Sequence, residues 1–577
     1  MNRAFSKLFD PLQIGKVTIK NRIAMAPMAT LGMTDSAGIL AQRAIDYYVE
    51  RAKGGVGLII TGAFKVEGDI DPIGKSRPIR LALSYPLGEL SDSVHAFGTK
   101  IFVQLTAGLG RVAIPVMLHG KLVSASAIPS YWDPSTTCRE LATEEVERIV
   151  KAFGSAVEIM VRAGVDGVEL HGHEGYLFDQ FTAAIWNRRT DRYGGDLKGR
   201  LTFPIEVLQE IKGRAGKDFP VQYRFGLKHY IKGLHAGALT GEEYVEAGRD
   251  IDEGLAMAKL LEQAGFDALH VDAGCYDSWY WAHPPIYQKH GCMVDMAAKV
   301  KEVVKIPVIA VGRLEIPELA EKVIEEGKAD MVALGRGLLA DPYWPIKVQE
   351  GRIEDIRPCL GCHDGCMGRM LDQNKPLSCA VNPATGREKL YELRPALKPK
   401  KVIVVGGGIA GMEAARVVAT RGHKVTLYEK GSTLGGHLVE ASVPDFKKDL
   451  ERLNNWYQGQ LRNLGVEIEF ETEVTPELVE RENLDVVFVA TGSEPIIPDA
   501  PGIGKPHVVT CIDLLLGKKE AGESVVVVGA GLIGCETALW LAKQGKKVTI
   551  VEMLSEPLIA TPPIPHANRV KLLFCFS

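Results

Sequence analysis

Short apolar runs rich in β-branched residues recur between residues 10 and 345 and alternate with longer amphipathic stretches. The runs are "VGLIIT", "KIFVQL", "GVDGVEL", "FPVQYRF", "FDALHVD", "IPVIAVG" and "ADMVALG", and "NRIAMAPM" is the expected first strand before them. This alternation is typical of parallel strands joined by helices, and its length favours a closed barrel over an open sheet. We therefore predict an α/β chain that begins with a TIM (β/α)8 barrel.

Polar and glycine residues follow the expected barrel strands, at the end where TIM barrels place their active sites. The stretch "GVELHGHEGYLFDQF" carries His171, Glu174 and Tyr176 within six residues. A lone histidine or tyrosine is more often structural, but the position at a strand end favours a catalytic role. Arg224 ends "VQYR" and would place a fixed positive charge in the barrel mouth, which suits the anionic ring of a reduced flavin.

The last two expected barrel strands each end in a glycine and an arginine. Gly312 and Arg313 follow one strand, and Gly335 and Arg336 follow the next. TIM barrels commonly bind a phosphate group at this place. No mechanism follows for Gln104, in "FVQL", from the sequence alone.

A dinucleotide-binding motif opens the C-terminal part of the chain. Gly406, Gly408 and Gly411 form G-x-G-x-x-G directly after the strand "KVIVV" and before a helix. Such glycines let the backbone approach a pyrophosphate, whose charge the helix N-terminus stabilises. Glu429 ends the next strand, where an acid accepts a ribose hydroxyl.

The same arrangement returns about 120 residues later. Gly529, Gly531 and Gly534 repeat the motif, and Glu552 ends the following strand. An acid at this position repels a 2'-phosphate, so the second unit should prefer NADH to NADPH. Two such units in tandem indicate FAD in the first and NADH in the second.

Four cysteines gather between these regions. Cys359, Cys362 and Cys366 lie within eight residues, and Cys379 follows. Soft thiolates in a group of four suit a 4Fe-4S cluster or a structural zinc ion. Zinc sites usually present two Cys-x2-Cys pairs, whereas three cysteines on one loop with a solitary fourth favour iron-sulfur; zinc and a metal-free loop remain alternatives.

Composition excludes several classes of function. With 577 residues, 24% charged residues and a net charge of -4, the chain is too long for one core and lacks a basic nucleic-acid footprint. No signal peptide or run of about 18 apolar residues occurs, so we expect a cytoplasmic protein without membrane partners. The expected domains are the barrel (1–345), the cluster segment and linker (346–395), the FAD domain (396–520) and the NAD domain (521–577).

Together these motifs carry a resemblance. "KNRIAMAPM", "FVQL", "HEGYL", "NRRTDRYGGDLKGR", "VGR" and "ALGRGLLADP", followed by the cysteines and the tandem nucleotide folds, resemble the multidomain branch of the Old Yellow Enzyme family. That branch includes 2,4-dienoyl-CoA reductase, trimethylamine dehydrogenase and the clostridial 2-enoate reductases. The resemblance implies FMN in the barrel, a 4Fe-4S cluster on the four cysteines, FAD and NADH in the C-terminal part, and a homo-oligomer.

The resemblance also assigns roles to individual residues. Tyr176 matches the proton donor, and His171 and Glu174 match the substrate-orienting pair, although the second is more often Asn or His. A further family histidine follows "DALHVD", where Tyr276 and His283 are the candidates. The implied FMN contacts are Pro27, Met28, Ala29, Ala63, Gln104, Arg224, Gly312, Arg313, Gly335 and Arg336.

Within the branch, "YYVERAKGGVGLIITG", "HEGYLFDQF" and "DAGCYDSWYWAHPP" look most like 2-enoate reductases. The resemblance therefore implies NADH-dependent reduction of the activated C=C bond of a 2-enoate, with electrons passing from NADH through FAD, the cluster and FMN, and Tyr176 as proton donor. Reduction of 2,4-dienoyl-CoA, bile-acid or flavonoid double bonds remains an alternative. An amine dehydrogenase of the same fold remains another, but the first cysteine is Cys138, which excludes the covalent flavin of trimethylamine dehydrogenase. A non-catalytic metal-binding scaffold would need decayed flavin motifs, and these are intact.

In such reductases the NAD unit is inserted into the FAD domain, and the chain returns to complete both. Here 25 residues follow Glu552. We therefore expect a truncated sequence in which both nucleotide domains are incomplete.

Overall fold

The computed structural model describes residues 3–29, 32–34, 39–68, 70, 83–113, 122–239, 241–560 and 562–576. The chain forms two compact units, each built from two stretches of sequence. The first unit holds Met1–Gly351 and Gly365–Lys389, and the second holds Arg352–Asp364 and Leu390–Ser577. The stretch 346–395, expected as one segment, is thus divided between the two units.

The first unit contains a closed barrel of parallel strands. Eight strands of the described ranges form its ring: β3 (Ile23–Met25), β4 (Leu58–Ile60), β6 (Lys100–Thr106), β9 (Gly167–Gly172), β10 (Val221–Gly226), β13 (Ala268–Asp272), β14 (Val308–Ala310) and β15 (Met331–Leu334). The ring closes because β3 pairs with both β15 and β4, and β4 pairs with β6. A short strand, β5 (Phe64–Lys65), adds to β6. The predicted TIM barrel is confirmed.

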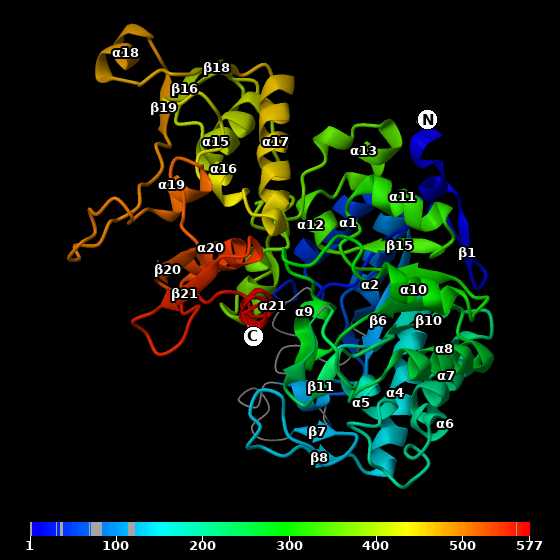
Figure 1. Cartoon of the computed structure of the whole chain (residues 1–577). Coiled ribbons are helices and arrows are strands. Elements are labelled where there is room, and N and C mark those ends of the chain that lie inside the picture. Colours follow the sequence, from blue (N-terminus) through cyan, green and yellow to red (C-terminus); the bar gives the residue numbers. More distant parts are fainter. Residues whose placement is uncertain are drawn as a thin grey trace. The chain divides into compact units, whose positions relative to one another are not determined.

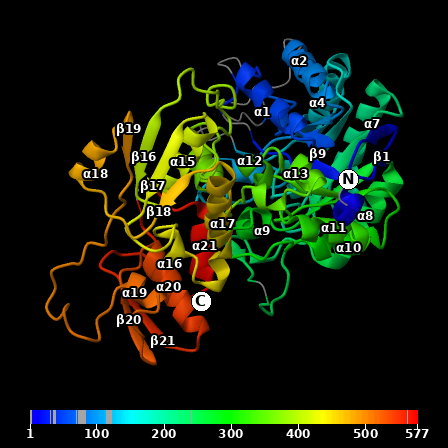
Figure 2. The same cartoon turned by 90° about the horizontal axis from the view of Figure 1, so that it is seen from above.

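Helices cover the outside of the barrel (Figure 1, Figure 2). They are α1 (Gln42–Lys53), α2 (Ser84–His95), α4 (Thr143–Arg162), α7 (Thr202–Ala215), α8 (Ile251–Ala264), α10 (Val294–Lys301), α11 (Pro317–Glu325) and α13 (Trp344–Glu350). In α4 the apolar residues recur at helical spacing, so that Val146, Ile149, Phe153 and Val157 are all buried on one face.

One end of the barrel is plugged. The hairpin β1 (Leu12–Ile14) and β2 (Val17–Ile19) adds Ile14 and Ile19 to the apolar cluster inside the barrel. A side chain on its turn residue, Gly15, would meet Asp267 and Pro220, which precede β13 and β10. The hairpin therefore covers the N-terminal ends of the strands, which leaves the C-terminal ends for a site.

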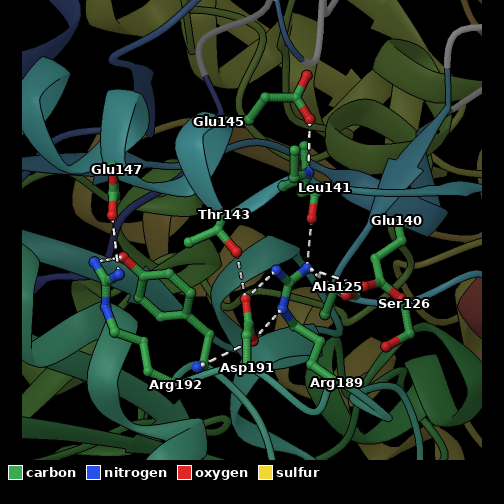
Figure 3. A network of polar contacts seen from close by, with 12 residues as sticks. Ala125, Ser126, Glu140, Leu141, Thr143, Glu145, Glu147, Arg189, Asp191 and Arg192 are labelled. Atoms are coloured by element: carbon green, nitrogen blue, oxygen red, sulfur yellow. Dashed lines mark hydrogen bonds and ion pairs between the residues drawn. The ribbon is translucent and has the colours of Figure 1, made fainter.

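A polar network fixes the excursion between β6 and α4 (Figure 3). Arg189 donates hydrogen bonds to the carbonyl oxygens of Ala125 (3.1 Å) and Leu141 (2.5 Å). The carboxylate of Asp191 accepts from the Arg189 Nε atom at 2.9 Å and from the Thr143 hydroxyl at 2.7 Å. The segment "NRRTDRYGG" is thus a structural clamp on residues 125–143, a role that its sequence did not reveal.

The second unit is built on a parallel sheet with the strand order β18 (Glu467–Glu469), β17 (Lys424–Tyr428), β16 (Lys401–Val405) and β19 (Val486–Val489). The helices α15 (Ile409–Thr420) and α17 (Lys448–Asn463) belong to this part. A second strand–helix–strand unit follows, with β20 (Ser524–Val528), α20 (Leu532–Lys543) and β21 (Lys547–Val551), and α21 (His566–Phe574) comes last. The predicted Rossmann-like C-terminal part is confirmed.

Membrane insertion has no support in the helices of this structure. Over the described ranges, none combines the length and the apolar character that crossing a bilayer requires.

Candidate active site

The strand register brings the polar residues of the barrel mouth together. Arg224 on β10 lies opposite His171 on β9 and His270 on β13. The guanidinium of Arg224 contacts the carboxylate of Asp272, with Nε 3.2 Å from Oδ2. Burial alone would lower the pKa of Arg224, but Asp272 and nearby carboxylates outweigh it and raise the pKa. The arginine is therefore a permanent cation in the barrel mouth, as expected from the sequence.

A tight turn at Glu174 and Gly175 follows β9 and lies between the predicted catalytic residues His171 and Tyr176. Glu174 has a φ of 64°, and Gly175 has a φ of 77°. The turn is held by two hydrogen bonds: the Tyr276 amide donates to the Glu174 carbonyl (3.1 Å), and the Gly175 amide donates to the Asp179 carboxylate (2.9 Å). A positive φ is costly for a residue other than glycine and is found mostly where the surroundings fix it, often at functional sites.

His171 and Tyr176 stack on each other. Their ring centroids lie 4.4 Å apart, and the Tyr176 hydroxyl lies 3.4 Å from that of Tyr276. Burial, assisted by Tyr276 and Glu174, raises the pKa of Tyr176 well above its ordinary value, so the phenol keeps its proton. Burial, assisted by His173, lowers the pKa of His171 well below its ordinary value, so the imidazole stays neutral.

Glu174 is a carboxylate in this site. Burial alone would raise its pKa, but His283 and His173 outweigh the burial and lower the pKa below its ordinary value. The Nε2 atom of His283 lies 2.9 Å from the Glu174 Oε1 atom. An ionised carboxylate only accepts hydrogen bonds. Within this pair His283 therefore donates and Glu174 accepts.

His173 is a site residue that the sequence reasoning missed. Its Nδ1 atom lies 3.2 Å from the Asp272 Oδ2 atom, and its Nε2 atom lies 3.8 Å from the Glu174 Oε1 atom. The side chain is only 1% exposed. Residues two apart on a strand point to the same face, so the "HGH" spacing after "GVEL" was the available signal.

An aromatic cluster, consisting of Tyr131, Trp132, Tyr276 and Trp279, lies beside Tyr176. Tyr276 and Trp279 stack with centroids 4.5 Å apart, and Tyr131 meets Tyr276 edge-on at 5.3 Å. Tyr176 lies 5.8 Å from Tyr276. Tyr276 was the one candidate that the sequence offered among these four residues. Tyr131 and Trp132 come from the excursion between β6 and α4, and no motif marked Trp279.

Hydrogen bonds inside the barrel hold the side chain of Gln104 in one orientation. Its Nε2 atom donates to Glu169 Oε1 at 2.7 Å, and Gln222 donates to the other carboxylate oxygen at 2.6 Å. Glu169 is fully buried inside the barrel. This bond fixes which end of the amide faces Glu169, and it leaves the carbonyl oxygen of Gln104 to accept a hydrogen bond. That orientation suits an imide N–H of a flavin.

The remaining residues expected to contact FMN follow the C-terminal ends of their strands. Pro27, Met28 and Ala29 follow β3 and Ala63 follows β4; a side chain on Gly62 would lie 2.3 Å from the Met28 carbonyl oxygen. A Cβ atom added to Gly335 would lie 3.5 Å from the sulfur atom of Met28, so the ends of β15 and β3 are close together.

The expected phosphate contacts lie at the last two strand ends. Gly312 and Arg313 follow β14, and Arg336 begins α12 (Arg336–Ala340). The Arg313 guanidinium donates to the Ile286 carbonyl at 3.0 Å. Their roles as FMN contacts stay predictions.

The four clustered cysteines belong to both units: Cys359 and Cys362 to the second, Cys366 and Cys379 to the first. In the first unit the Ser378 amide donates to the Gly365 carbonyl at 3.0 Å. This bond brings the residue before Cys379 next to the residue before Cys366. In the second unit the Gly361 amide donates to the Cys359 sulfur at 3.4 Å. None of the ten cysteines, all of which are described, forms a disulfide. The assignment of these four cysteines as ligands of a 4Fe-4S cluster stays a prediction.

The two glycine motifs of the second unit have the same geometry. The first glycines, Gly406 and Gly529, have φ angles of 104° and 100°. A Cβ atom on the third glycine of either motif, Gly411 or Gly534, would lie 1.9 Å from the carbonyl oxygen of the first glycine of the same motif. The middle glycines, Gly408 and Gly531, precede α15 and α20. Glu429 accepts from the Gly407 amide at 2.7 Å, and Glu552 accepts from the Ala530 amide at 2.6 Å. A strand-to-helix turn whose third glycine leaves no room for a side chain fits a pyrophosphate-binding motif.

Comparisons with known proteins cover nearly the whole chain. The model of the "NADH:flavin oxidoreductase / NADH oxidase family" matches residues 7–355, and "Pyridine nucleotide-disulphide oxidoreductase" matches residues 400–570. The cinnamate reductase of Clostridium sporogenes is 50% identical, over 99% of this chain and 87% of that protein. The NADH oxidase of Thermoanaerobacter brockii is 44% identical, over 98% and 86%. The solved structure of 2-naphthoyl-CoA reductase with 2-naphthoyl-CoA has a TM-score of 0.91 at 30% identity, over 99% of this chain and 86% of that one.

Proposed function

Because this chain belongs to the NADH:flavin oxidoreductase / NADH oxidase family, we propose that it reduces the activated C=C bond of a 2-enoate with electrons from NADH. It is a flavin-dependent oxidoreductase, and its cofactors are FMN, FAD, NADH and an iron-sulfur cluster. The observation that carries the proposal is the stacked pair of Tyr176 and His171. One member keeps its proton, and the other is a neutral imidazole that can donate a hydrogen bond.

The residues of the site divide the work between holding the substrate and moving a proton. His171, and His283 when both of its ring nitrogens carry a proton, would donate hydrogen bonds to the substrate carboxylate, while Glu174 would orient His283 from 2.9 Å. These bonds strengthen as negative charge develops on the substrate oxygen. The chemistry that FMN supplies when bound is hydride transfer to the β-carbon. The Tyr176 hydroxyl would deliver the proton to the α-carbon.

Residues elsewhere would hold the cofactors. Gln104 and Arg224 would contact the flavin ring in the barrel, and the last two barrel strand ends would contact its phosphate. Cys359, Cys362, Cys366 and Cys379 would bind the 4Fe-4S cluster. The glycine motifs at Gly406 and Gly529 would bind FAD and NADH, whose part is to deliver electrons to the barrel site.

A second candidate function is oxidation of an amine. The ionised Glu174 beside the aromatic cluster favours it, because a carboxylate and aromatic faces both attract an ammonium group. The intact NADH motif at Gly529 favours the reductase instead. An amine dehydrogenase would have its flavin reduced by the amine in the absence of NADH, whereas an enoate reductase would have its reduced flavin oxidised by the alkene.

The test is a Tyr176→Phe variant of the anaerobically purified holoenzyme. Flavin reduction by NADH should be unchanged, whereas reoxidation by cinnamate or crotonate should slow by about 100-fold or more, as expected when a general acid is lost. Tyr131→Phe is the matched control, because it removes a hydroxyl from the neighbouring aromatic cluster and should have little effect. Normal reoxidation in Tyr176→Phe would remove this residue as the acid.

A further inference from the structure

Three side chains of the turn after β9 form a compact donor set. One nitrogen of His171, one of His173 and one carboxylate oxygen of Glu174 all lie within 4.8 Å of one another. The three residues are 5%, 1% and 7% exposed. Two imidazoles and a carboxylate at this separation have the composition of a transition-metal site.

Two histidine nitrogens of this set lack a hydrogen bond. Among the residues that the structure describes, the Nδ1 atom of His171 and the Nε2 atom of His173 make none. A buried polar atom left without a partner destabilises the folded chain. An ion bound between these side chains would satisfy the nitrogens that face it and remove part of that destabilisation.

The spacing between the donors fits an ion better than a direct bond. The His173 Nε2 atom and the Glu174 Oε1 atom are 3.8 Å apart, which is too long for a hydrogen bond. Two ligands of a tetrahedral zinc ion lie roughly 3.4 Å apart, given bonds of about 2.1 Å. A small closure of the two side chains would therefore place both on one ion.

The surrounding side chains supply the partners that metal ligands usually have. Asp272 lies 3.2 Å from the other ring nitrogen of His173, and His283 contacts Glu174 at 2.9 Å. Carboxylates that contact the second nitrogen of a ligating histidine fix the orientation of its ring. Asp272 and Glu174 together carry two negative charges against the positive charge of Arg224, which favours a cation.

We propose that His171, His173 and Glu174 bind a divalent transition-metal ion, best matched by Zn²⁺, and that the bound ion blocks the substrate position. Two nitrogens and one oxygen leave a coordination position open for water, as in zinc sites with three protein ligands. Mg²⁺ should not compete, because it prefers oxygen ligands. The blocking rests on the proposed function, since His171 is there a substrate contact; the metal binding itself does not.

Direct binding tests the site. Untagged holoenzyme, with its iron content measured, is dialysed against micromolar Zn²⁺, and bound zinc is quantified by mass spectrometry. His173→Ala should bind one zinc fewer than the wild type, with an affinity at least about tenfold weaker. His423→Ala is the control, because it removes an imidazole from the other unit. The iron content shows whether zinc has entered the cysteine site instead.

Equal zinc uptake by the wild type and His173→Ala, at equal flavin and iron content, would overturn the proposal. If His173→Ala fails to fold, His173→Gln keeps the side-chain volume and must show the same loss of zinc.

Inhibition then tests the blocking. Zn²⁺ should inhibit alkene-dependent flavin reoxidation competitively with the enoate, and His173→Ala should raise the inhibition constant at least about tenfold. Mg²⁺ at the same concentration should have no effect. Zinc uptake that depends on His173 without competition would support the metal site but overturn the blocking. Failure of alkene reduction itself, with that uptake intact, would count against the proposed function alone.

Discussion

Arg111 and Asp277 form a buried ion pair whose loss should loosen the aromatic cluster. Both side chains are fully buried, and the two guanidinium nitrogens donate to the two carboxylate oxygens at 2.7 and 3.2 Å. Asp277 follows Tyr276 and lies two residues before the start of the helix α9 (Trp279–Ala282). Removing one partner of a buried pair leaves the other charge unpaired and costs about 3–5 kcal/mol. Arg111→Met should therefore lower the local opening free energy by about 3–5 kcal/mol.

The partner variant separates the pair from other effects. Asp277→Leu should cost a similar amount and also removes the hydrogen bond from the His235 amide (2.6 Å). The double variant Arg111→Met/Asp277→Leu leaves no unpaired charge, so it should cost less than the sum of the two single variants. We expect a coupling energy of at least about 2 kcal/mol.

Hydrogen exchange is the appropriate assay, because a chain with two units has no single unfolding free energy. Protection is followed by mass spectrometry for peptides that contain residues 276–282, with peptides of α20 in the other unit as the internal control. A change below about 1 kcal/mol in Arg111→Met, or strictly additive single variants, would refute the claim that the pair is desolvated and coupled.

Two further predictions follow from the site and the glycine motifs. Because the pKa of Tyr176 is raised, its proton-donating form persists to higher pH than for an ordinary tyrosine, so alkene-dependent flavin reoxidation should not decline between pH 7 and about 10; a decline centred near pH 8 that is absent from the NADH half-reaction would contradict the assignment. Gly406→Ala should abolish FAD binding, because the residue has a φ of 104° and the new Cβ would lie 2.3 Å from the Ala490 carbonyl oxygen. Gly459→Ala, whose Cβ would meet nothing within 4 Å, should retain FAD when the flavin content of the purified proteins is measured.

Periodicity predicted the architecture because it depends on local patterns. Each barrel strand is a short apolar run, so the alternation with helices was visible without any knowledge of pairing. The glycine motifs were equally local, since strand, turn and helix lie within a few residues of each other. The barrel and the Rossmann-like part were therefore both predictable.

The interior of the site was less predictable, because its contacts join distant strands. His173, after β9, reaches Asp272 on β13 past the intervening strand β10, and Glu169 on β9 reaches Gln104 on the adjacent strand β6, with no local signal for either contact. The family resemblance named Glu174 but left its role open. Only the 2.9 Å contact with His283 shows that it can act through a second side chain. The aromatic cluster was missed for the same reason, since Tyr131 and Tyr276 are 145 positions apart in a chain that folds them to 5.3 Å.

The pairing of β3 with β15 has a consequence for engineering. Ala24 lies opposite Ala333, so the chain enters the ring of strands beside the place where it leaves. A short linker could join the two ends of the barrel segment, and new termini could be opened at an outer loop such as the one at Gly216, where an added side chain would meet nothing within 4 Å. A circularly permuted barrel would have its N- and C-termini far from the C-terminal ends of the strands. It could then be fused to a different electron-donating protein without rebuilding the catalytic face.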